Sequence, residues 1–586
     1  MMKNFSRRDF IKGMSTATVG AGALGLLTAC GSTNPPPAGA DTPGASQAQA
    51  GVPSFMMEPE AIPEDKIDET KTADIIVIGA GVSGLCLACR ATELGSSVIV
   101  FAASAKHVER GGSNHGIDTK TQQKKGINYK AKDMAHRLKQ EFMAAGYNVD
   151  QEKWSTWLKH NTESMNWLID KMENHGAGVT LELGYHDEDY LFDFAPASHN
   201  FVFPEGTSEV FKSNPFFGAA FGQALVNDMY QYEILKNGGK IDFETTALYL
   251  IRGDKANGKS GRVTAVIAKD SGGRYIKYVG KKAIVMATGD FSQNKEMMEA
   301  YCPQALDILA EREIDYNAGF QFGGLYPGDG HKMGLWAGAA WQKAYPNAAM
   351  VDNLNGPYSK GISNVCTINL NADGLRYMNE DTLCSYSAWA TKQQPGKAAY
   401  YIWDSAYAHH YDEWATFGTT LGGDNAWNGP RTKTPEEMLA AWEEGVEKGT
   451  YVKADTLEEL VTKLEGLNGE QALKTLKKYN EYCEAGYDPD FLKNAKELAP
   501  IKTGPFYGMK YTIGFANFLC VTGGLRTNPE MQVCDENDQP IEGLYNIGIM
   551  VGDMYANTYN FAICGHNLSS TCNTFPYLLA ERLKEA

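Results

Sequence analysis

A short hydrophobic strand that leads directly into a glycine-rich turn constrains this chain more than any other feature. Residues 73–78 (ADIIVI) form a β-branched run typical of a buried strand, and GAGVSG follows at residues 79–84. Gly79 permits a tight turn, Gly81 lets the backbone approach a pyrophosphate, and Gly84 lets the next helix pack closely on the strand. Strand, GxGxxG and helix in this order predict an α/β fold with a Rossmann-like dinucleotide-binding domain.

The adenosine end of this predicted site lacks its usual acidic residue. The second strand, residues 97–101, should be followed by a carboxylate that holds the ribose hydroxyls, but Ala102 and Ala103 stand there. Backbone groups or neighbouring polar side chains would have to replace that carboxylate. Cys86 and Cys89 form a CxxC motif in the first helix, within a hydrophobic run, and we expect them to pack in the core.

Residues 1–30 are typical of an export signal. Arg7 and Arg8 precede a weakly hydrophobic segment rich in Gly, Ala and Thr, which resembles a signal for the Tat translocase, a carrier of folded proteins. The segment ends in LTAC at residues 27–30, which resembles a lipobox, so we expect Cys30 to be acylated and to anchor the protein at a membrane surface. Cleavage after a later small residue such as Ala50, which releases a free protein, is the alternative.

Composition limits the remaining possibilities. Residues 31–70 are rich in Pro, Gly, Ala and Ser and are expected to form a flexible linker outside the fold. A formal net charge of -17 argues against a nucleic-acid partner. No hydrophobic run after the signal is long enough to span a membrane. The eleven cysteines are scattered without zinc, iron–sulfur or CxxCH spacing, and we interpret them mainly as buried thiols and expect no metal site.

Four further motifs occur in a fixed order: RGGSN at residues 110–114, ATGDF at 287–291, GDGHKM at 328–333 and NADGLRYMNE at 371–380. Together with the glycine turn, they resemble the fumarate reductase/succinate dehydrogenase flavoprotein family, which includes urocanate reductases and 3-ketosteroid dehydrogenases. The resemblance covers roughly residues 72–586 and implies that the nucleotide is FAD.

The resemblance also implies a discontinuous FAD-binding domain with an inserted α+β capping domain. The first FAD-binding part would span residues 71–340, the cap 341–504 and the second part 505–586. Residues 240–250, 262–269 and 282–286 have strand patterns, and 433–486 has helical patterns with acidic starts, as this division requires. The implied FAD-binding residues are Gly79, Ala80, Gly81, Ser83, Gly84, Ala102, Gly112, Ser113, Ala247, Ala287, Thr288, Gly289, Asp329, Gly330, Ile549, Asn567 and Leu568.

The residues with which fumarate reductases bind and protonate a dicarboxylate are replaced here. Counted from the motifs, the proton-donating Arg falls on Cys384, and its Glu and Arg relay fall on Lys360 and Ser363. The substrate His falls on Cys520 and the C-terminal substrate Arg on Tyr559, and no His lies between His331 and His409. We therefore expect no fumarate reduction, because a buried dicarboxylate without cations is costly, and we expect a less charged substrate.

Tyr559 resembles instead the C-terminal Tyr with which ketosteroid dehydrogenases hydrogen-bond a ketone oxygen. We predict that Tyr559 polarises a carbonyl and that Tyr555 protonates carbon, the alternative being that both only pack under the cap. Cys384 and Cys520 could touch substrate or be inert filler. His115 could tune the flavin or relay protons, or be structural, and for His331 we expect a structural role.

These features predict an exported FAD-dependent enzyme that reduces a C=C bond conjugated to a carbonyl, such as an enone, a steroid or an aromatic acrylate. The chain has neither a haem motif nor a second GxGxxG for a nicotinamide, so a separate extracytoplasmic donor, a multihaem cytochrome c or a quinol dehydrogenase, is implied. Two alternatives remain: a flavin dehydrogenase that introduces unsaturation next to a ketone, and a flavin redox shuttle without catalysis.

Overall fold

The computed structural model describes residues 52–181, 197–202, 222–318, 321–352, 368–410, 434–560 and 562–585. The chain divides into two units, Met1–Gly51 and Val52–Ala586, and the described residues all belong to the second. The predicted export signal, Cys30, Lys360 and Ser363 lie outside the described residues. The backbone of Cys384 is described, but its side chain is not.

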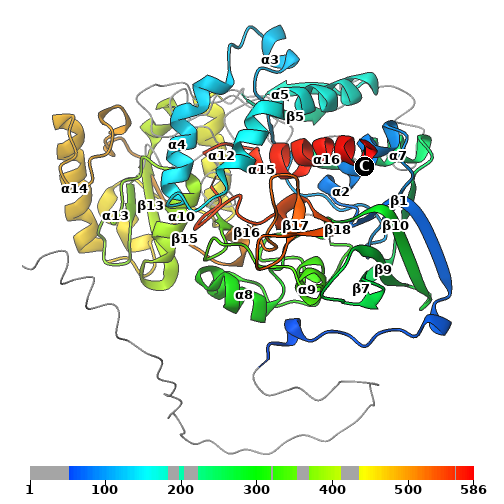
Figure 1. The fold of residues 1–586 in the computed structure, drawn as a ribbon. Coiled ribbons are helices and arrows are strands. Elements are labelled where there is room, and N and C mark those ends of the chain that lie inside the picture. The colour runs from blue at the N-terminus through cyan, green and yellow to red at the C-terminus, as the bar shows by residue number, and fades with distance from the viewer. Residues whose placement is uncertain are drawn as a thin grey trace, which may run out of the picture. The chain divides into compact units, whose positions relative to one another are not determined.

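A mixed nine-stranded sheet organises the larger part of the fold (Figure 1). Its path is β6-β2-β1-β10-β9-β7-β8, and β18 pairs with both β10 and β17. Its strands are β1 (Glu69–Ile78), β2 (Val98–Phe101), β6 (Lys240–Asp242), β7 (Thr245–Arg252), β8 (Lys255–Ala256), β9 (Val263–Asp270), β10 (Tyr275–Met286), β17 (Gln532–Cys534) and β18 (Pro540–Asn546). β6, β2, β1, β10 and β18 are parallel, so their carboxyl ends meet at one edge.

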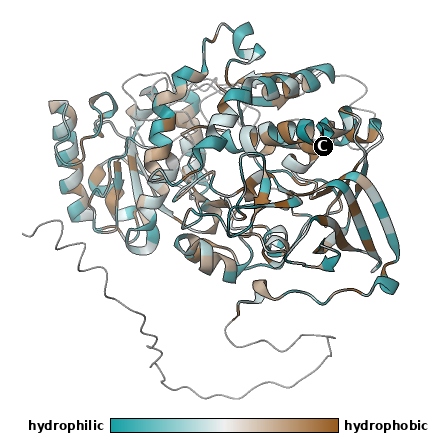
Figure 2. Ribbon diagram, viewed as in Figure 1, coloured by the Kyte–Doolittle hydropathy of each residue, from teal (hydrophilic) through white to brown (hydrophobic). Residues whose placement is uncertain are grey.

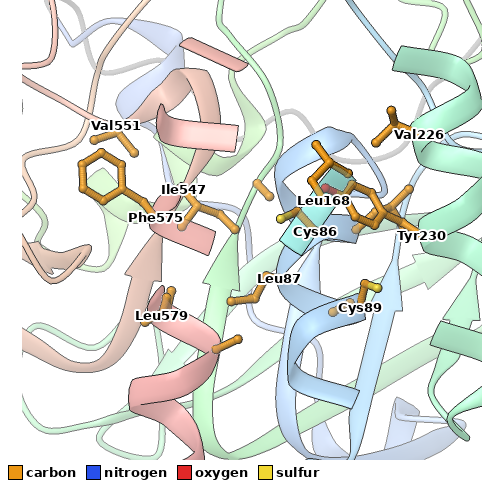
Figure 3. Close-up of a cluster of buried hydrophobic side chains, with 14 of the residues drawn as sticks. Cys86, Leu87, Cys89, Leu168, Val226, Tyr230, Ile547, Val551, Phe575 and Leu579 are labelled. Atoms are coloured by element: carbon orange, nitrogen blue, oxygen red, sulfur yellow. The ribbon is translucent and has the colours of Figure 1, made fainter. Parts of the chain in front are cut away.

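Both faces of this sheet are buried, as expected for parallel strands. Ile75 and Val77 of β1 pack with α2 (Val82–Glu93), while Ile76 and Ile78 pack on the opposite face with α9 (Asp329–Trp336). The first face is also covered by α5 (Gln151–Asn174), α7 (Gly222–Lys236) and α16 (Phe575–Glu585). Figure 3 shows Cys86 and Cys89 among the side chains of this core, which confirms their predicted packing role.

A second, antiparallel sheet lies in the predicted cap, in the order β12-β13-β15-β14. Its strands are β12 (Ile368–Leu370), β13 (Ala398–Asp404), β14 (Val452–Ala454) and β15 (Phe506–Thr512). Alternate residues of β13 face α12 (Pro435–Glu447) on one side and α13 (Leu457–Lys463) with α14 (Gly469–Ala485) on the other. Figure 2 shows the corresponding alternation of hydrophobic and hydrophilic residues along the long strands of the large sheet.

Smaller elements connect the two sheets. Two short sheets are formed by β3 (Asn114–His115), β5 (Ser198–Val202) and β4 (Gly178–Leu181), and by β11 (Ala349–Val351) and β16 (Phe518–Val521). The other α-helices of the described residues are α3 (Lys120–Lys124), α4 (Ala135–Ala144), α8 (Lys295–Tyr301), α10 (Cys384–Lys392) and α15 (His566–Ser569), and a π-helical turn at Ser570–Thr574 joins α15 to α16. Within the described ranges, no helix is long and apolar enough to cross a membrane.

The structure corrects the predicted linker of residues 31–70. Residues 52–70 pack on the body: Phe55 is buried in a hydrophobic cluster, and the Trp336 indole donates a hydrogen bond to its carbonyl over 2.9 Å. The Ile62 N–H donates to the Tyr249 hydroxyl over 2.7 Å, and β1 begins at Glu69. One large hydrophobic side chain and paired backbone groups suffice to dock this segment, which its average composition did not indicate.

The strand patterns at residues 262–269 and 282–286 are confirmed by β9 and β10, and the pattern at residues 240–250 divides between β6 and β7. Residues 433–486 contain α12, α13 and α14, as predicted, and also β14. β15 starts at Phe506 and pairs with β13 and β14 in the second sheet. The division into an FAD-binding domain and a cap stays a prediction. The free cysteines of the described residues are all buried except Cys483, as predicted for thiols in the core.

Candidate functional site

The glycine turn lies at the carboxyl edge of the large sheet, between β1 and α2. The Gly79 N–H donates to the Phe101 carbonyl over 2.8 Å, which joins the turn to the end of β2. Gly79 has a φ of +115°, and a Cβ there would lie 2.2 Å from the Ala287 carbonyl oxygen. A Cβ on Gly84 would lie 2.1 Å from the Gly79 oxygen. Close backbone packing therefore requires both glycines.

A cavity opens at this edge, and its walls come from widely separated parts of the chain. The predicted cofactor residues that line it are Gly79, Ala80, Gly81, Ser83, Ala102, Ala247, Ala287, Thr288, Gly289, Asp329, Ile549, Asn567 and Leu568. The remaining predicted residues lie outside its lining: Gly84, Gly112, Ser113 and Gly330. Gly330 supports the wall from behind, because its N–H donates to the Thr288 hydroxyl over 3.1 Å.

The cavity lining contains little charge. Asp329 is its one carboxylate and Arg110 its one cation. The Tyr316 hydroxyl donates to Asp329 over 2.6 Å, while Arg110 pairs with the buried Asp290 over 3.2 Å. At the end of β2, the lining consists of Ala102, Ala103 and Ser104, so no carboxylate stands at the predicted ribose position.

His107 lies in the same loop as Arg110 and pairs with two carboxylates. Its ring contacts Asp228 over 2.7 Å and Glu109 over 3.1 Å. Burial by itself lowers the pKa of His107, but the hydrogen bonds to the two carboxylates outweigh burial and raise the pKa to about 9. The His107 imidazolium is therefore charged at neutral pH and pairs with Asp228 and Glu109, and we call these three residues the charged clamp.

Sequence reasoning missed several residues of the lining. Arg110 could have been predicted to line the cavity, because it is the first residue of the RGGSN motif. Tyr316 and Tyr326 belong to no motif, and Thr246 lies in a stretch whose pattern indicated only a strand. Among the described residues, no group of three or more His, Cys, Asp or Glu side chains could hold a metal ion.

The residues of the cavity fit a flavin dinucleotide. Gly79 and Gly81 have no side chains, so a pyrophosphate can approach the backbone of the turn closely. The N-terminus of α2 begins directly after Gly81, and its free N–H groups favour a negatively charged group there. A Cβ at Gly79 would collide with the wall itself, so the turn cannot be filled by another residue without moving the strands.

Tyr559 and Tyr555 lie together outside the lining of the cavity, and Tyr559 is connected to that lining through Asn567. Both are less than one-tenth exposed, and their ring centroids are 4.5 Å apart. Burial raises the pKa of Tyr559 well above its usual value, although a backbone hydrogen bond from Asn567, a residue of the cavity lining, lowers it in part. The Tyr559 hydroxyl is therefore protonated at neutral pH and stands next to the cavity wall.

Tyr555 is coupled to His566. Its hydroxyl and the His566 Nδ1 are 2.5 Å apart, and the imidazole stacks on Trp154 with centroids 4.0 Å apart. Burial raises the pKa of Tyr555 and lowers that of His566 well below its usual value, so both groups are neutral. In the tautomer with its proton on Nδ1, the imidazole donates to the Tyr555 oxygen and leaves the tyrosine O–H free to donate elsewhere, while the His566 Nε2 has no partner among the described residues.

His115, His331 and Cys520, three residues that the sequence singled out and whose side chains are described, are all buried. His115 is buried between the Cys564 carbonyl at 3.0 Å and the Tyr129 hydroxyl at 3.2 Å, and burial lowers its pKa to about 3. A structural role fits this geometry better than a proton relay. His331 is also buried, with Nε2 3.0 Å from the Gly523 carbonyl. Burial raises the pKa of Cys520, so its thiol is protonated at neutral pH.

The chain is similar to known proteins over most of its length. A family model described as "FAD binding domain" matches residues 74–565. A vinyl phenol reductase from Lactiplantibacillus plantarum is 26% identical over 519 residues, which are 85% of this chain and 93% of the relative. Among solved structures, the 3-ketosteroid-delta4-(5alpha)-dehydrogenase of Rhodococcus jostii RHA1 superposes with a TM-score of 0.63 at 22% identity, covering 90% of this chain and 100% of that one. The open conformation of a flavocytochrome c3 fumarate reductase gives a TM-score of 0.56 at 19% identity, with 91% and 82% of the two chains covered.

Proposed function

We propose that this chain, which belongs to the FAD binding domain family, reduces an uncharged alkene whose double bond is conjugated to an oxygen-bearing group. It is an FAD-dependent oxidoreductase that acts on CH–CH groups. The observation that supports the proposal most is the position of Tyr559. This buried phenol stands beside the cofactor cavity at a point where the family resemblance implies a cationic substrate residue.

FAD, held by the glycine turn and the other residues of the cavity, would supply the hydride that adds to one alkene carbon. The protein polarises the substrate: Tyr559 accepts a backbone hydrogen bond from Asn567, so its own O–H remains to donate to a substrate oxygen. Such a donor, aimed at developing negative charge, contributes on the order of 10² to 10³ in rate. Tyr555 then protonates the second carbon, and the neutral His566 orients its hydroxyl.

The lack of an unpaired cation beside the cavity favours a neutral substrate. Arg110 already pairs with Asp290, and Tyr559 and Cys520 occupy positions where a dicarboxylate would need cations. We therefore propose that the substrate is an enone, a steroid or an aromatic acrylate. If the acrylate is an acid and not an ester, its carboxylate would lie outside the cavity. A vinyl phenol is a second candidate, because similarity to the vinyl phenol reductase extends over 93% of that relative.

Export and the electron donor are proposals of the same kind. The twin arginines and the LTAC sequence support export by the Tat translocase and acylation of Cys30 on the extracytoplasmic face of the cell membrane. A separate cytochrome or quinol-linked dehydrogenase would then deliver electrons. Fractionation of cells that express Cys30→Ser tests the anchor: release of this variant from membranes that retain the wild type supports acylation, and retention of both contradicts it.

Anaerobic reoxidation of the dithionite-reduced holoenzyme tests the function directly. Enones, aromatic acrylates, vinyl phenols and fumarate are added in turn, and the return of oxidised-flavin absorbance is followed. We expect fast reoxidation by at least one neutral alkene and none by fumarate. Reoxidation by fumarate alone would contradict the neutral-substrate argument. If no alkene reoxidises the flavin, reduction of the oxidised flavin by a saturated ketone would identify a dehydrogenase, and its absence a redox shuttle.

A further inference from the structure

One asparagine side chain joins three separate elements beside the two tyrosines. The amide nitrogen of Asn560, the residue that follows Tyr559, donates to the Glu141 carboxyl over 3.3 Å and to the Tyr386 hydroxyl over 2.8 Å. Glu141 lies on α4 and Tyr386 on α10, so the amide links the N-terminal part, the predicted cap and the C-terminal segment. The same C-terminal segment carries Tyr555, Tyr559 and the cavity residue Asn567.

The orientation of this amide is fixed. The Asn560 Oδ1 accepts the backbone N–H of Ala562 over 2.8 Å, and a backbone N–H can only donate. The NH₂ group must therefore face Glu141 and Tyr386. Because an NH₂ group can only donate, the Glu141 Oε2 that it contacts is an acceptor, and a carboxylic acid proton would sit on Oε1.

Glu141 has no cation to stabilise a negative charge. The described residues form no ion pair with its carboxyl, and the Asn560 contact is its one hydrogen bond among them. The titratable groups around it are Tyr386 on α10 and Tyr555 in the C-terminal segment, both of which interact with its charge, and Arg137 one turn earlier on α4, whose guanidinium contacts the Tyr129 hydroxyl. Burial raises the pKa of Glu141 to about 8.

We propose that Glu141 is the proton reservoir for alkene reduction, passing its Oε1 proton to Tyr555 and Tyr559, the tyrosine pair that Asn567 connects to the cavity lining. This inference rests on the proposed function. When hydride reaches one alkene carbon, the electron pair of the π bond takes a proton from the Tyr555 hydroxyl at the other carbon. The resulting tyrosinate takes the proton of Glu141, and the Glu141 carboxylate regains a proton from water. One hydride and one proton are thus consumed for each alkene, and the flavin ends oxidised.

The test is the oxidative half-reaction of Glu141→Gln. Glutamine keeps the acceptor oxygen for Asn560 and the volume of the side chain but has no acidic proton. We expect unchanged FAD content and unchanged reduction by dithionite, whereas reoxidation by the alkene slows by about 10². The wild-type rate should also fall as pH rises through 8, the pKa of Glu141, and this pH dependence should be absent from the variant. Glu152→Gln, an exposed glutamate in the first turn of α5, is the matched control and should behave as the wild type.

The outcomes separate the reservoir from the function. Reoxidation of the wild type by no alkene overturns the proposed function and the reservoir together. Reoxidation of the wild type with an unchanged rate and pH profile in Glu141→Gln overturns the reservoir alone. If the variant does not retain FAD, infrared spectra of the wild-type holoenzyme decide: a protonated-carboxyl band that titrates near pH 8 supports the reservoir, and its absence overturns it. Asp381, whose pKa burial raises to about 6, titrates separately from this band.

Discussion

Replacing Gly79 by alanine tests the close contact on which the cofactor cavity depends. The new Cβ would lie 2.2 Å from the Ala287 oxygen and 2.8 Å from the Ala287 carbonyl carbon, both of which are backbone atoms that no rotamer change can move. The Ala287 N–H also donates to the Ile78 carbonyl over 2.9 Å, so relief of the clash must separate β1 from the segment after β10. Overpacking of this kind costs about 1–3 kcal/mol. The φ of +115° adds roughly 1–2 kcal/mol for a residue with a Cβ.

Two other glycines separate the steric cost from the conformational one. Gly95 has a φ of +88° and nothing within 4 Å of its would-be Cβ, so Gly95→Ala should pay only the conformational cost of roughly 1–2 kcal/mol. Gly84 lies inside α2, and its Cβ would meet the Gly79 oxygen at 2.1 Å. Gly84→Ala should therefore show the steric cost without the penalty for positive φ.

The assay combines urea unfolding with the ratio of flavin to protein absorbance after purification. We expect Gly79→Ala to lose about 2–5 kcal/mol of unfolding free energy and most of its FAD. Gly95→Ala should keep FAD at the wild-type ratio. The reasoning is refuted if Gly79→Ala retains wild-type FAD and is no less stable than Gly95→Ala.

Three further predictions concern the tyrosine, the charged clamp and the cap. Tyr559→Phe should lower alkene turnover at least about tenfold without loss of FAD, because it removes one hydrogen-bond donor; unchanged turnover would exclude Tyr559 from the mechanism. His107→Gln should remove a pH-dependent part of the stability. The pKa of His107 is raised to about 9 in the folded state, so its contribution, of the order of 3 kcal/mol, is complete below the unfolded pKa of about 6.5 and disappears as pH rises through 9. Unfolding curves of wild type and variant should therefore converge at high pH, and a constant difference would contradict the assignment. Arg376→Met should destabilise the chain by about 3–5 kcal/mol, since it removes the guanidinium that pairs with the fully buried Glu380 and Asp488 and leaves only Lys493, 3.8 Å from Glu380, beside them; a loss below about 1 kcal/mol in urea unfolding would show that the network is not strongly stabilising.

The sequence alone determined the local parts of this protein. The turn at residues 79–84, the strand before it and the helix after it follow from steric demands that neighbouring residues impose on one another. About half of the residues that line the cofactor cavity could be named in advance, because the ordered motifs resemble a flavoprotein family whose cofactor positions can be carried over. The core role of Cys86 and Cys89 likewise follows from the hydrophobic run around them.

The tertiary structure decided what depends on contacts between distant segments. Residues 52–70 dock because Phe55 finds a cluster that no local pattern announces, and β15 joins the second sheet because its partners lie elsewhere in the chain. Asn560 meets Glu141 across 419 positions and Tyr386 across 174. Sequence periodicity reports only which face of an element is buried, and it carries no information on which distant side chain shares that burial. The uncharged Glu141 and its amide partner are therefore products of the fold, because only burial among these elements removes the water that would otherwise ionise the carboxyl.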